Sequence, residues 1–345
     1  MKKSIPISLS LLVLNLTACN PLKPSDKTTS SGYEFAMISS GDNFPSFDPM
    51  SNDYPGILLM LHQGKTKNEI REHFNWDENT LNSRISVLKE ANFIRMAANG
   101  KLAPNVFVCR RSDGEEIYKK VRKIGTQIAD SIEHDSARIA QEAGRLNAFR
   151  FFKFGDISLL ILSNVLLDNW QIQTVEEQVL KSPRTLHHGR NYYASYQEKS
   201  AVGGLESFGI YGNQVENAGN FSICRYGNSR YSKEVMALNQ ELKKEFTSSH
   251  SIHGHSCPIL ENGDLGKLQE IADSFSPMLL GILNQNKGLF LESYRESAYF
   301  QEISFEEYFI WVYHFVYTAA TDELISRKVI KLPDGNTAFY IMKNE

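Results

Sequence analysis

The chain has 345 residues, a formal net charge of −3 at pH 7, and 41% hydrophobic and 22% charged residues. This near-neutral charge excludes the strong attraction to nucleic acid or to anionic lipid that a basic protein would have. The composition is that of a globular protein, and the length suffices for more than one hydrophobic core.

The N-terminus has the pattern of a secretory signal. Lys2 and Lys3 precede an apolar run over residues 5–14. The run is shorter than the roughly twenty residues that a membrane-spanning helix needs. It leads into four residues that resemble the lipobox of bacterial lipoproteins, Leu16-Thr17-Ala18-Cys19.

The lipobox resemblance implies that residues 1–18 are a signal peptide and that Cys19 carries the lipid. We therefore expect a protein of the bacterial cell envelope, held on a membrane by its acyl chains. Asn20 follows the cysteine, whereas an aspartate there is linked with inner-membrane retention in enteric bacteria. The sequence thus favours the outer membrane or the periplasmic face in a Gram-negative cell.

The next segment, residues 19–49, is rich in Ser, Thr, Pro, Gly and Asp. Such a composition buries too little apolar surface to offset its ordering entropy, so we expect a flexible tether. Four apolar side chains indicate that its later part docks on the following domain: Phe35, Met37, Phe44 and Phe47.

Residues 50–152 are expected to form the first domain. Thr66 and Glu69 have the spacing of a capping box, and a turn at Asn99-Gly100 joins two extended segments after three predicted helices. This order of elements over residues 54–110 resembles the winged helix, the helix-turn-helix variant of many bacterial regulators.

The third predicted helix of this domain is not basic, because Arg84 and Lys89 are offset by Asp77, Glu78 and Glu90. Affinity for DNA comes mainly from Lys and Arg that reach phosphates. We therefore expect no nucleic-acid partner and interpret the domain as a packing or protein-binding unit.

A long amphipathic helix is predicted to follow. Its apolar stripe repeats at the helical period, through Ile117, Val121, Ile124, Ile128 and Ile132. The stripe leaves three roles open: a dimer contact, a strut between two domains, or packing on the helix's own domain.

Residues 153–345 are expected to form an α+β domain, mainly helical with a small antiparallel sheet. Gly-Asn pairs at 212–213 and 227–228 are interpreted as turns that end strands. The C-terminal segment, from Leu324 to Met342, resembles the last helix and wing of a second winged helix. The fold class expected for the chain is α+β.

The cysteines beyond Cys19 are Cys109, Cys224 and Cys257. In an exported protein this odd number allows one disulfide within the chain, for which Cys224 and Cys257 are the favoured pair. Buried thiols are an equally open alternative.

A second candidate site is the histidine-rich segment His250-Ser251-Ile252-His253-Gly254-His255-Ser256-Cys257-Pro258. Imidazole and thiolate are ligands of zinc, so His253, His255 and Cys257 could bind zinc or another transition metal, with His250 or His314 completing the site. Residues 253–258 resemble a signature of the formylmethanofuran dehydrogenase operon E family. The similarity ends there and implies no activity, and a polar loop is the alternative.

A third candidate is the aromatic helix predicted over residues 304–318. Glu307, Trp311 and His314 share a face and could line a ligand pocket, although a core helix with one hydrogen-bonded histidine is the favoured interpretation. The weaker segment His187-His188-Gly189-Arg190 is either a solvated loop or a contact for anionic groups.

These patterns favour a membrane-anchored envelope lipoprotein that is not an enzyme and binds a protein partner or a ligand. Hydrolase and nucleotide-binding motifs are lacking in the sequence, so we expect no cofactor. The alternatives are a metal-binding protein or metal-dependent enzyme and, if the signal is misread, a winged-helix transcriptional regulator.

Overall fold

The structure is a computed structural model. It describes residues 32–39, 43–180, 184, 186–199, 210–217, 221–228, 240, 242, 244, 257–333 and 337–343. Helices predominate and the strands form small sheets, which confirms the α+β class. Within those ranges, none of the helices combines the length and apolar composition that crossing a membrane requires.

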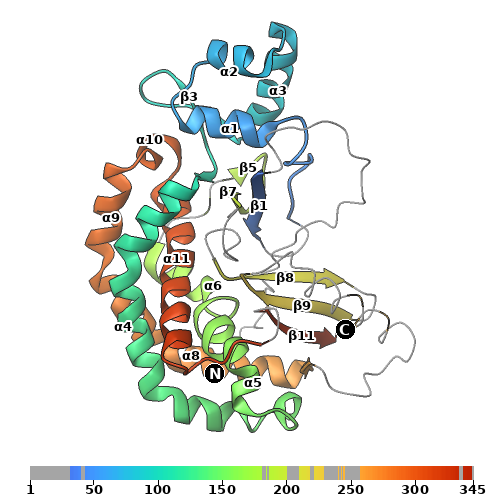
Figure 1. Cartoon of the computed structure of the whole chain (residues 1–345), viewed down its shortest axis with the longest axis vertical. Coiled ribbons are helices and arrows are strands. Elements are labelled where there is room, and N and C mark those ends of the chain that lie inside the picture. Colours follow the sequence, from blue (N-terminus) through green and yellow to red (C-terminus); the bar gives the residue numbers. More distant parts are fainter. Residues whose placement is uncertain are drawn as a thin grey trace, which may run out of the picture.

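Three short helices and a hairpin form the N-terminal module, at the top of Figure 1. The predicted capping box between Thr66 and Glu69 is present at the start of the second helix. Two side chains, Thr66 and Asp77, cap successive helices by accepting backbone N–H bonds. The elements are α1 (Tyr54–His62), α2 (Lys67–Phe74), α3 (Glu78–Glu90), β2 (Ile94–Met96) and β3 (Leu102–Pro104).

A three-stranded sheet lies between this module and the helical body. Its order is β1 (Tyr33–Ile38), β7 (Tyr193–Glu198) and β4 (Phe107–Cys109), with β7 antiparallel to β1 and parallel to β4. Successive side chains point to opposite faces of a strand. One face of the sheet therefore packs on the module and the other on the body.

Strand β1 falls in the segment that composition predicted to be a tether. Phe35 and Met37 are buried in the core of the N-terminal module, and Phe44 and Phe47 pack against that core. Backbone pairing with β7 adds to this burial, because all six residues of β1 have partners in β7. The strand pairing connects segments more than 150 residues apart, which composition cannot reveal.

The helical body is built on two long helices that lie side by side, α4 (Arg111–Ala143) and α11 (Phe305–Ser326) (Figure 1). The predicted stripe on α4 is buried throughout. It packs within its own chain, against α11 and against α8 (Asn262–Gln285). The remaining helices of the body are η2 (Asn147–Phe149), α5 (Phe154–Leu159), η3 (Leu160–Val165), α6 (Ile172–Val175), η4 (Glu176–Leu180), α9 (Lys287–Glu296) and α10 (Tyr299–Glu302).

A four-stranded sheet completes the body, in the order β10 (Ile259–Leu260), β11 (Thr337–Lys343), β9 (Phe221–Gly227) and β8 (Gly212–Asn217). The predicted turn at 212–213 is wrong, because both residues belong to β8. The Asn213 amide is buried and bonded to Asn164 and Asp168, so tertiary contacts hold a turn-forming residue in a strand. The hairpin of β5 (Leu186–His187) and β6 (Arg190–Asn191) forms a separate two-stranded sheet.

The C-terminal strand β11 pairs with β9 and β10. The sequence predicts that residues from 324 to 342 form the last helix and wing of a second winged helix. In the structure, residues 324–330 form the end of α11 and a turn. The partner strands of β11 therefore come from distant parts of the chain, not from the residues just before it.

Cys224 and Cys257 are buried thiols in the described structure, and the predicted disulfide between them is not formed. Cys224 belongs to the main core of the body, whereas Cys257 packs with Ile223, the next residue of β9. Because adjacent strand residues point to opposite faces, the two thiols lie on different faces of the sheet.

The contact between α4 and α11 requires glycine at position 125. A Cβ atom there would lie 2.6 Å from Ala319 Cβ and 2.8 Å from the backbone nitrogen of Ala320.

We predict that Gly125→Ala lowers the free energy of unfolding by about 1–3 kcal/mol through overpacking. Urea denaturation measures this change. Gly281→Ala in α8, where a Cβ meets nothing within 4 Å, is the matched control and should be neutral or stabilising.

Candidate functional site

A cavity of about 340 Å³ lies in the body beside β11, within the size range of small-molecule sites. Four parts of the chain meet around it: the residues from 152 to 160 at and before α5 and η3, Leu242, the chain before β10, and the chain leading into β11 with the start of that strand. The lining residues are Phe152, Gly155, Asp156, Ile157, Leu160, Leu242, Cys257, Pro258, Lys331, Leu332, Pro333, Thr337, Ala338 and Phe339.

Backbone hydrogen bonds hold these segments in place. The Lys331 N–H donates to Ser158 Oγ at 2.9 Å, which ties the segment before β11 to α5. The Ile341 N–H donates to the Pro258 carbonyl at 2.9 Å, which ties the segment before β10 to β11. The walls of the cavity are therefore set by tertiary contacts rather than by a single element.

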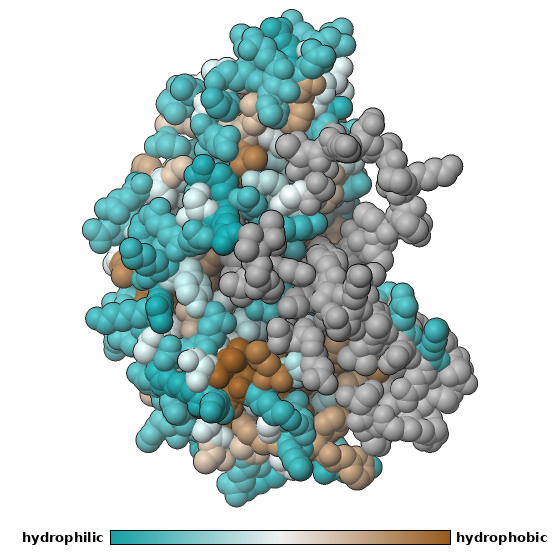
Figure 2. Space-filling view, in the orientation of Figure 1, coloured by the Kyte–Doolittle hydropathy of each residue, from teal (hydrophilic) through white to brown (hydrophobic). Residues whose placement is uncertain are grey.

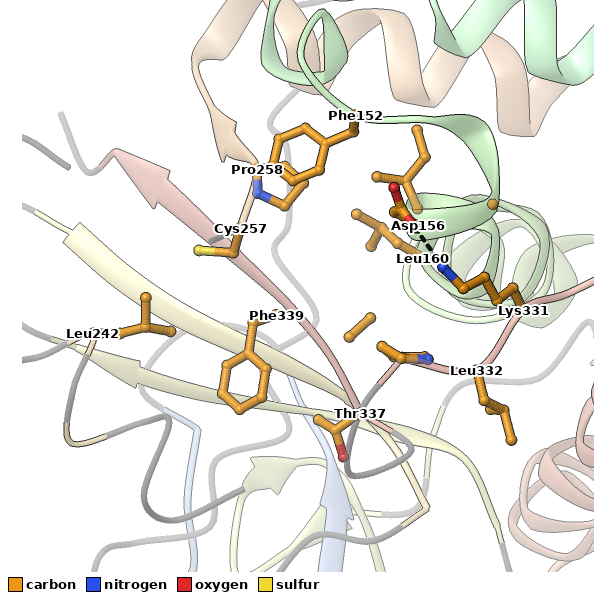
Figure 3. A pocket seen from close by; sticks show the side chains of 14 residues that line it. Phe152, Asp156, Leu160, Leu242, Cys257, Pro258, Lys331, Leu332, Thr337 and Phe339 are labelled. Carbon is orange, nitrogen blue, oxygen red and sulfur yellow. Dashed lines mark hydrogen bonds and ion pairs between the residues drawn. The ribbon is translucent and has the colours of Figure 1, made fainter. Parts of the chain in front are cut away.

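The cavity is mainly apolar, with one ion pair at its side. Phe152 and Phe339 approach it from opposite sides in Figure 3. Lys331 Nζ lies 2.8 Å from Asp156 Oδ1, and its hydrogen bond lowers the pKa of Asp156. Both charged side chains are exposed, so the pair stands where the cavity meets solvent. This arrangement could accept a molecule with an apolar body and one charged end.

Of the predicted ligands His253, His255 and Cys257, only Cys257 lies within the described residues, and it borders this cavity. His250, His253 and His255 lie outside the described residues. His314, offered as a completing ligand, is buried in α11 and is not part of the cavity lining. The Cys257 thiol is 3% exposed and packs with Leu242 and other apolar side chains. Among the residues that the structure describes, no group of three or more His, Cys, Asp or Glu residues is arranged to hold a metal ion. The metal site stays a prediction.

Glu307, Trp311 and His314 are brought together as predicted on one face of α11, but all three are buried and none borders the described cavity. The His314 Nδ1–H donates to the carbonyl of Ile310 at 2.8 Å. The Trp311 ring stacks on Phe107 of β4 at a centroid distance of 6.0 Å. Trp311 and Glu307 therefore contact the three-stranded sheet, whereas His314 bonds within its own helix. Their role as ligand contacts stays a prediction.

Glu307 and His187 form a buried contact that the sequence did not suggest. Glu307 Oε1 accepts the Ala194 N–H at 3.1 Å. Its Oε2 lies 3.9 Å from His187 Nε2, and neither atom has a hydrogen-bond partner among the described residues. His187 Nδ1 lies 3.1 Å from the carbonyl of Asn92 and must donate its proton there, so in the neutral ring Nε2 is an acceptor. Two acceptors then face each other.

The neighbouring residue of this segment behaves differently. His188 is exposed and its Nδ1–H donates to the carbonyl of Glu90 at 3.1 Å. The predicted loop is thus a short hairpin, with one histidine inside the protein and one outside. Both make backbone contacts with the end of α3 or the residues that follow it.

A second buried histidine, His62, lies between two carboxylates, and no local sequence pattern indicated this cluster. Asp113 and Glu302 supply the carboxylates, and the Arg110 guanidinium forms two hydrogen bonds to Asp113. Burial alone would lower the pKa of His62, but its hydrogen bonds to the two carboxylates outweigh burial and raise that pKa to about 9. Burial opposes ionisation of Asp113 as well, yet the bonds from His62 and Arg110 hold its pKa well below the ordinary range.

A third buried polar group joins the π-helix η3 to the four-stranded sheet. Ser163 Oγ lies 2.5 Å from the Tyr226 hydroxyl and 2.6 Å from Thr321 Oγ1. The amide groups of Asn164 and Asn213 bond to each other in both directions. Such a network fixes the packing of η3 against β8 and β9, because a buried polar group that loses its partner costs about 1–3 kcal/mol.

The Glu307–His187 contact gives a stability test. We predict that Glu307→Gln keeps the bond to the Ala194 N–H and donates its amide to His187 Nε2, raising the free energy of unfolding by about 0.5–1.5 kcal/mol. Glu307→Ala leaves the Ala194 N–H unpaired and should lower it by about 1–3 kcal/mol. Urea denaturation of both variants measures these changes. A Glu307→Gln protein less stable than Glu307→Ala would contradict this account.

Comparisons with known proteins identify no relative. No family model, no curated protein and no solved structure matches this chain.

Proposed function

We propose that the chain is a lipid-anchored protein of the bacterial cell envelope whose body binds a small amphiphilic molecule. The cavity beside β11 is the observation that carries the binding part of this proposal. The lipobox-like residues before Cys19 support the anchor. The protein acts in this proposal as a tethered binding protein rather than as an enzyme.

The chemistry of the cavity supports an amphiphile with a short apolar body. Aromatic and aliphatic side chains form most of the wall, and burial of apolar ligand surface contributes about 25 cal/mol per Å². The Lys331–Asp156 pair provides one charge of each sign at the cavity side. A carboxylate end would contact Lys331, and an ammonium end would contact Asp156.

We further propose that the N-terminal module is a winged-helix unit that binds or packs against protein. Its order of three helices and a hairpin supports this interpretation. Figure 2 shows a mainly hydrophilic surface over the module. The first turn of α3 begins with Asp77 and Glu78, which would repel DNA phosphates. These features argue against the alternative of a DNA-binding regulator.

Lipidation has a direct test. We predict that cells expressing the wild-type chain incorporate labelled palmitate into it, and that Cys19→Ser abolishes both the label and the recovery of the protein with membranes. Several acyl chains, each stabilised by about 0.8 kcal/mol per buried CH₂, account for the membrane association. Cys257→Ser is the control and should keep the label. Unchanged labelling of Cys19→Ser would contradict the anchor.

The cavity is tested with three ten-carbon probes: decanoate, decylamine and decanol. We predict that calorimetry detects binding of at least one charged probe, and that Gly155→Leu, which fills the cavity, weakens it at least about tenfold (about 1.4 kcal/mol). At position 155 a Cβ meets only Lys331 Cδ, at 3.6 Å, so the substitution is tolerated. Gly281→Leu, far from the cavity lining, is the control. Equal affinities of the two variants would contradict the site, and the preferred probe identifies the charge of the ligand.

A further inference from the structure

His62 ends α1 and lies between carboxylates of two other helices. Its Nδ1 is 2.8 and 2.9 Å from the two carboxylate oxygens of Glu302 in α10, and its Nε2 is 3.2 Å from Asp113 Oδ2 in α4. The side chains of His62 and Glu302 are 3% and 5% exposed. One imidazole therefore joins three elements that lie far apart in the sequence.

Burial raises the pKa of Glu302, while its hydrogen bond from His62 opposes that shift. When both carboxylates are ionised, the geometry requires a protonated ring. An ionised carboxylate only accepts hydrogen bonds, so both ring nitrogens must carry protons to donate to Glu302 and Asp113 together. With the imidazolium and Arg110 balancing the two carboxylates, the formal charges of the cluster sum to zero. Loss of the His62 proton would leave an uncompensated negative charge largely buried, which is strongly unfavourable.

Other charged and titratable groups surround the cluster from every side. From α10, the Tyr299 ring lies 5.2 Å from the imidazole. From β2, Arg95 donates to the backbone carbonyls of Glu302 and Gln301. Three further groups act on the same region from β4, β1 and β7: Cys109, Tyr33 and Glu198. Arg110, which bonds to the Asp113 carboxylate, is the positive group that competes with His62 for a carboxylate.

Two adjacent polar contacts join the N-terminal module to α10, one from His62 at the end of α1 and one from Arg95 on β2. Both contacts end on α10, at the side chain and the carbonyl of Glu302. The rest of the module is held by its apolar core on the outer face of the three-stranded sheet. Breaking the ionic contact would therefore loosen the end of α1 without unfolding the module.

We propose that His62 is a proton-dependent clamp, which holds the end of α1 against α4 and α10 while its ring is protonated and releases it when the proton is lost. The function is conformational: the clamp sets how firmly the N-terminal module is docked on the body. A two-state element biased by one proton is a known form of protein switch.

The direction of the pH dependence follows from the pKa of His62, which the two carboxylates raise from its ordinary 6.5 to about 9. A histidine with a raised folded-state pKa stabilises the folded state fully below its unfolded pKa and loses that contribution as the pH rises through the folded one. The clamp is therefore closed below about pH 6.5 and opens progressively toward pH 9 and above.

Two measurements on the full chain test the clamp. Titration of the histidine rings by NMR, with His62 assigned from His62→Gln, should give a His62 pKa close to 9. Trypsin cleavage at Lys65 and Lys67, just beyond α1, should be at least about tenfold faster in His62→Gln than in wild type at pH 6.5, because each pKa unit of the interaction represents a factor of ten. This ratio should fall toward one at pH 9.5, because the wild-type clamp opens.

The controls distinguish the clamp from general loss of stability. His73→Gln, the same substitution on the exposed face of α2, should be cleaved at the wild-type rate at every pH. Glu302→Gln keeps the shape of the side chain and removes one charge, so it should lower the His62 pKa by about 1–3 units even if His62→Gln does not fold. A His62 ring that titrates below pH 7 in wild type, or a cleavage ratio that is constant with pH, would overturn the proposal.

Discussion

The packing of α11 against α4 is the contact on which the rest of the structure depends. Gly125 lets the two helices approach until a single Cβ atom would clash, and α11 is buried along most of its length. Because α11 is enclosed, its polar groups reach other elements inside the protein: Glu307 accepts a backbone bond from β7, and Tyr317 donates to the carbonyl of Tyr211. One helix, α11, therefore positions the three-stranded sheet, the segment leading into β8, and α4, which is the first helix of the body.

Polar interactions in this protein are concentrated at the boundaries between elements rather than within a single pocket. The His62 cluster joins α1 to α4 and α10, and the Ser163 network joins η3 to β9 and α11. Buried polar groups specify a particular packing, since leaving one unpaired costs more than an apolar contact gains. The apolar cavity beside β11 differs from these boundaries. The Lys331–Asp156 ion pair lies at the side of the cavity, so the interior is free for an apolar ligand body.

The parts of the fold that could be predicted are those that depend on residues close together in the sequence. The capping box at Thr66 and the apolar stripe of α4 are local patterns, and the structure contains both. Errors arise where a distant partner overrides a local preference. Gly212 and Asn213 are in a strand because β9 and the Asn164 amide hold them there. Likewise, the sequence favoured a pairing of Cys224 with Cys257, but only the sheet decides that they face different sides.

The sequence by itself determined the α+β class, the helical period of the long helix and the near-neutral charge, because each depends on composition or on neighbours within a few residues. It also predicts the lipid anchor through a motif of four adjacent residues. Only the tertiary structure decided the pairing of β1 with β7, the enclosure of the cavity and the convergence of His62, Asp113 and Glu302. These features join segments separated by about 50 to 240 residues, and neither periodicity nor spacing carries information across such distances.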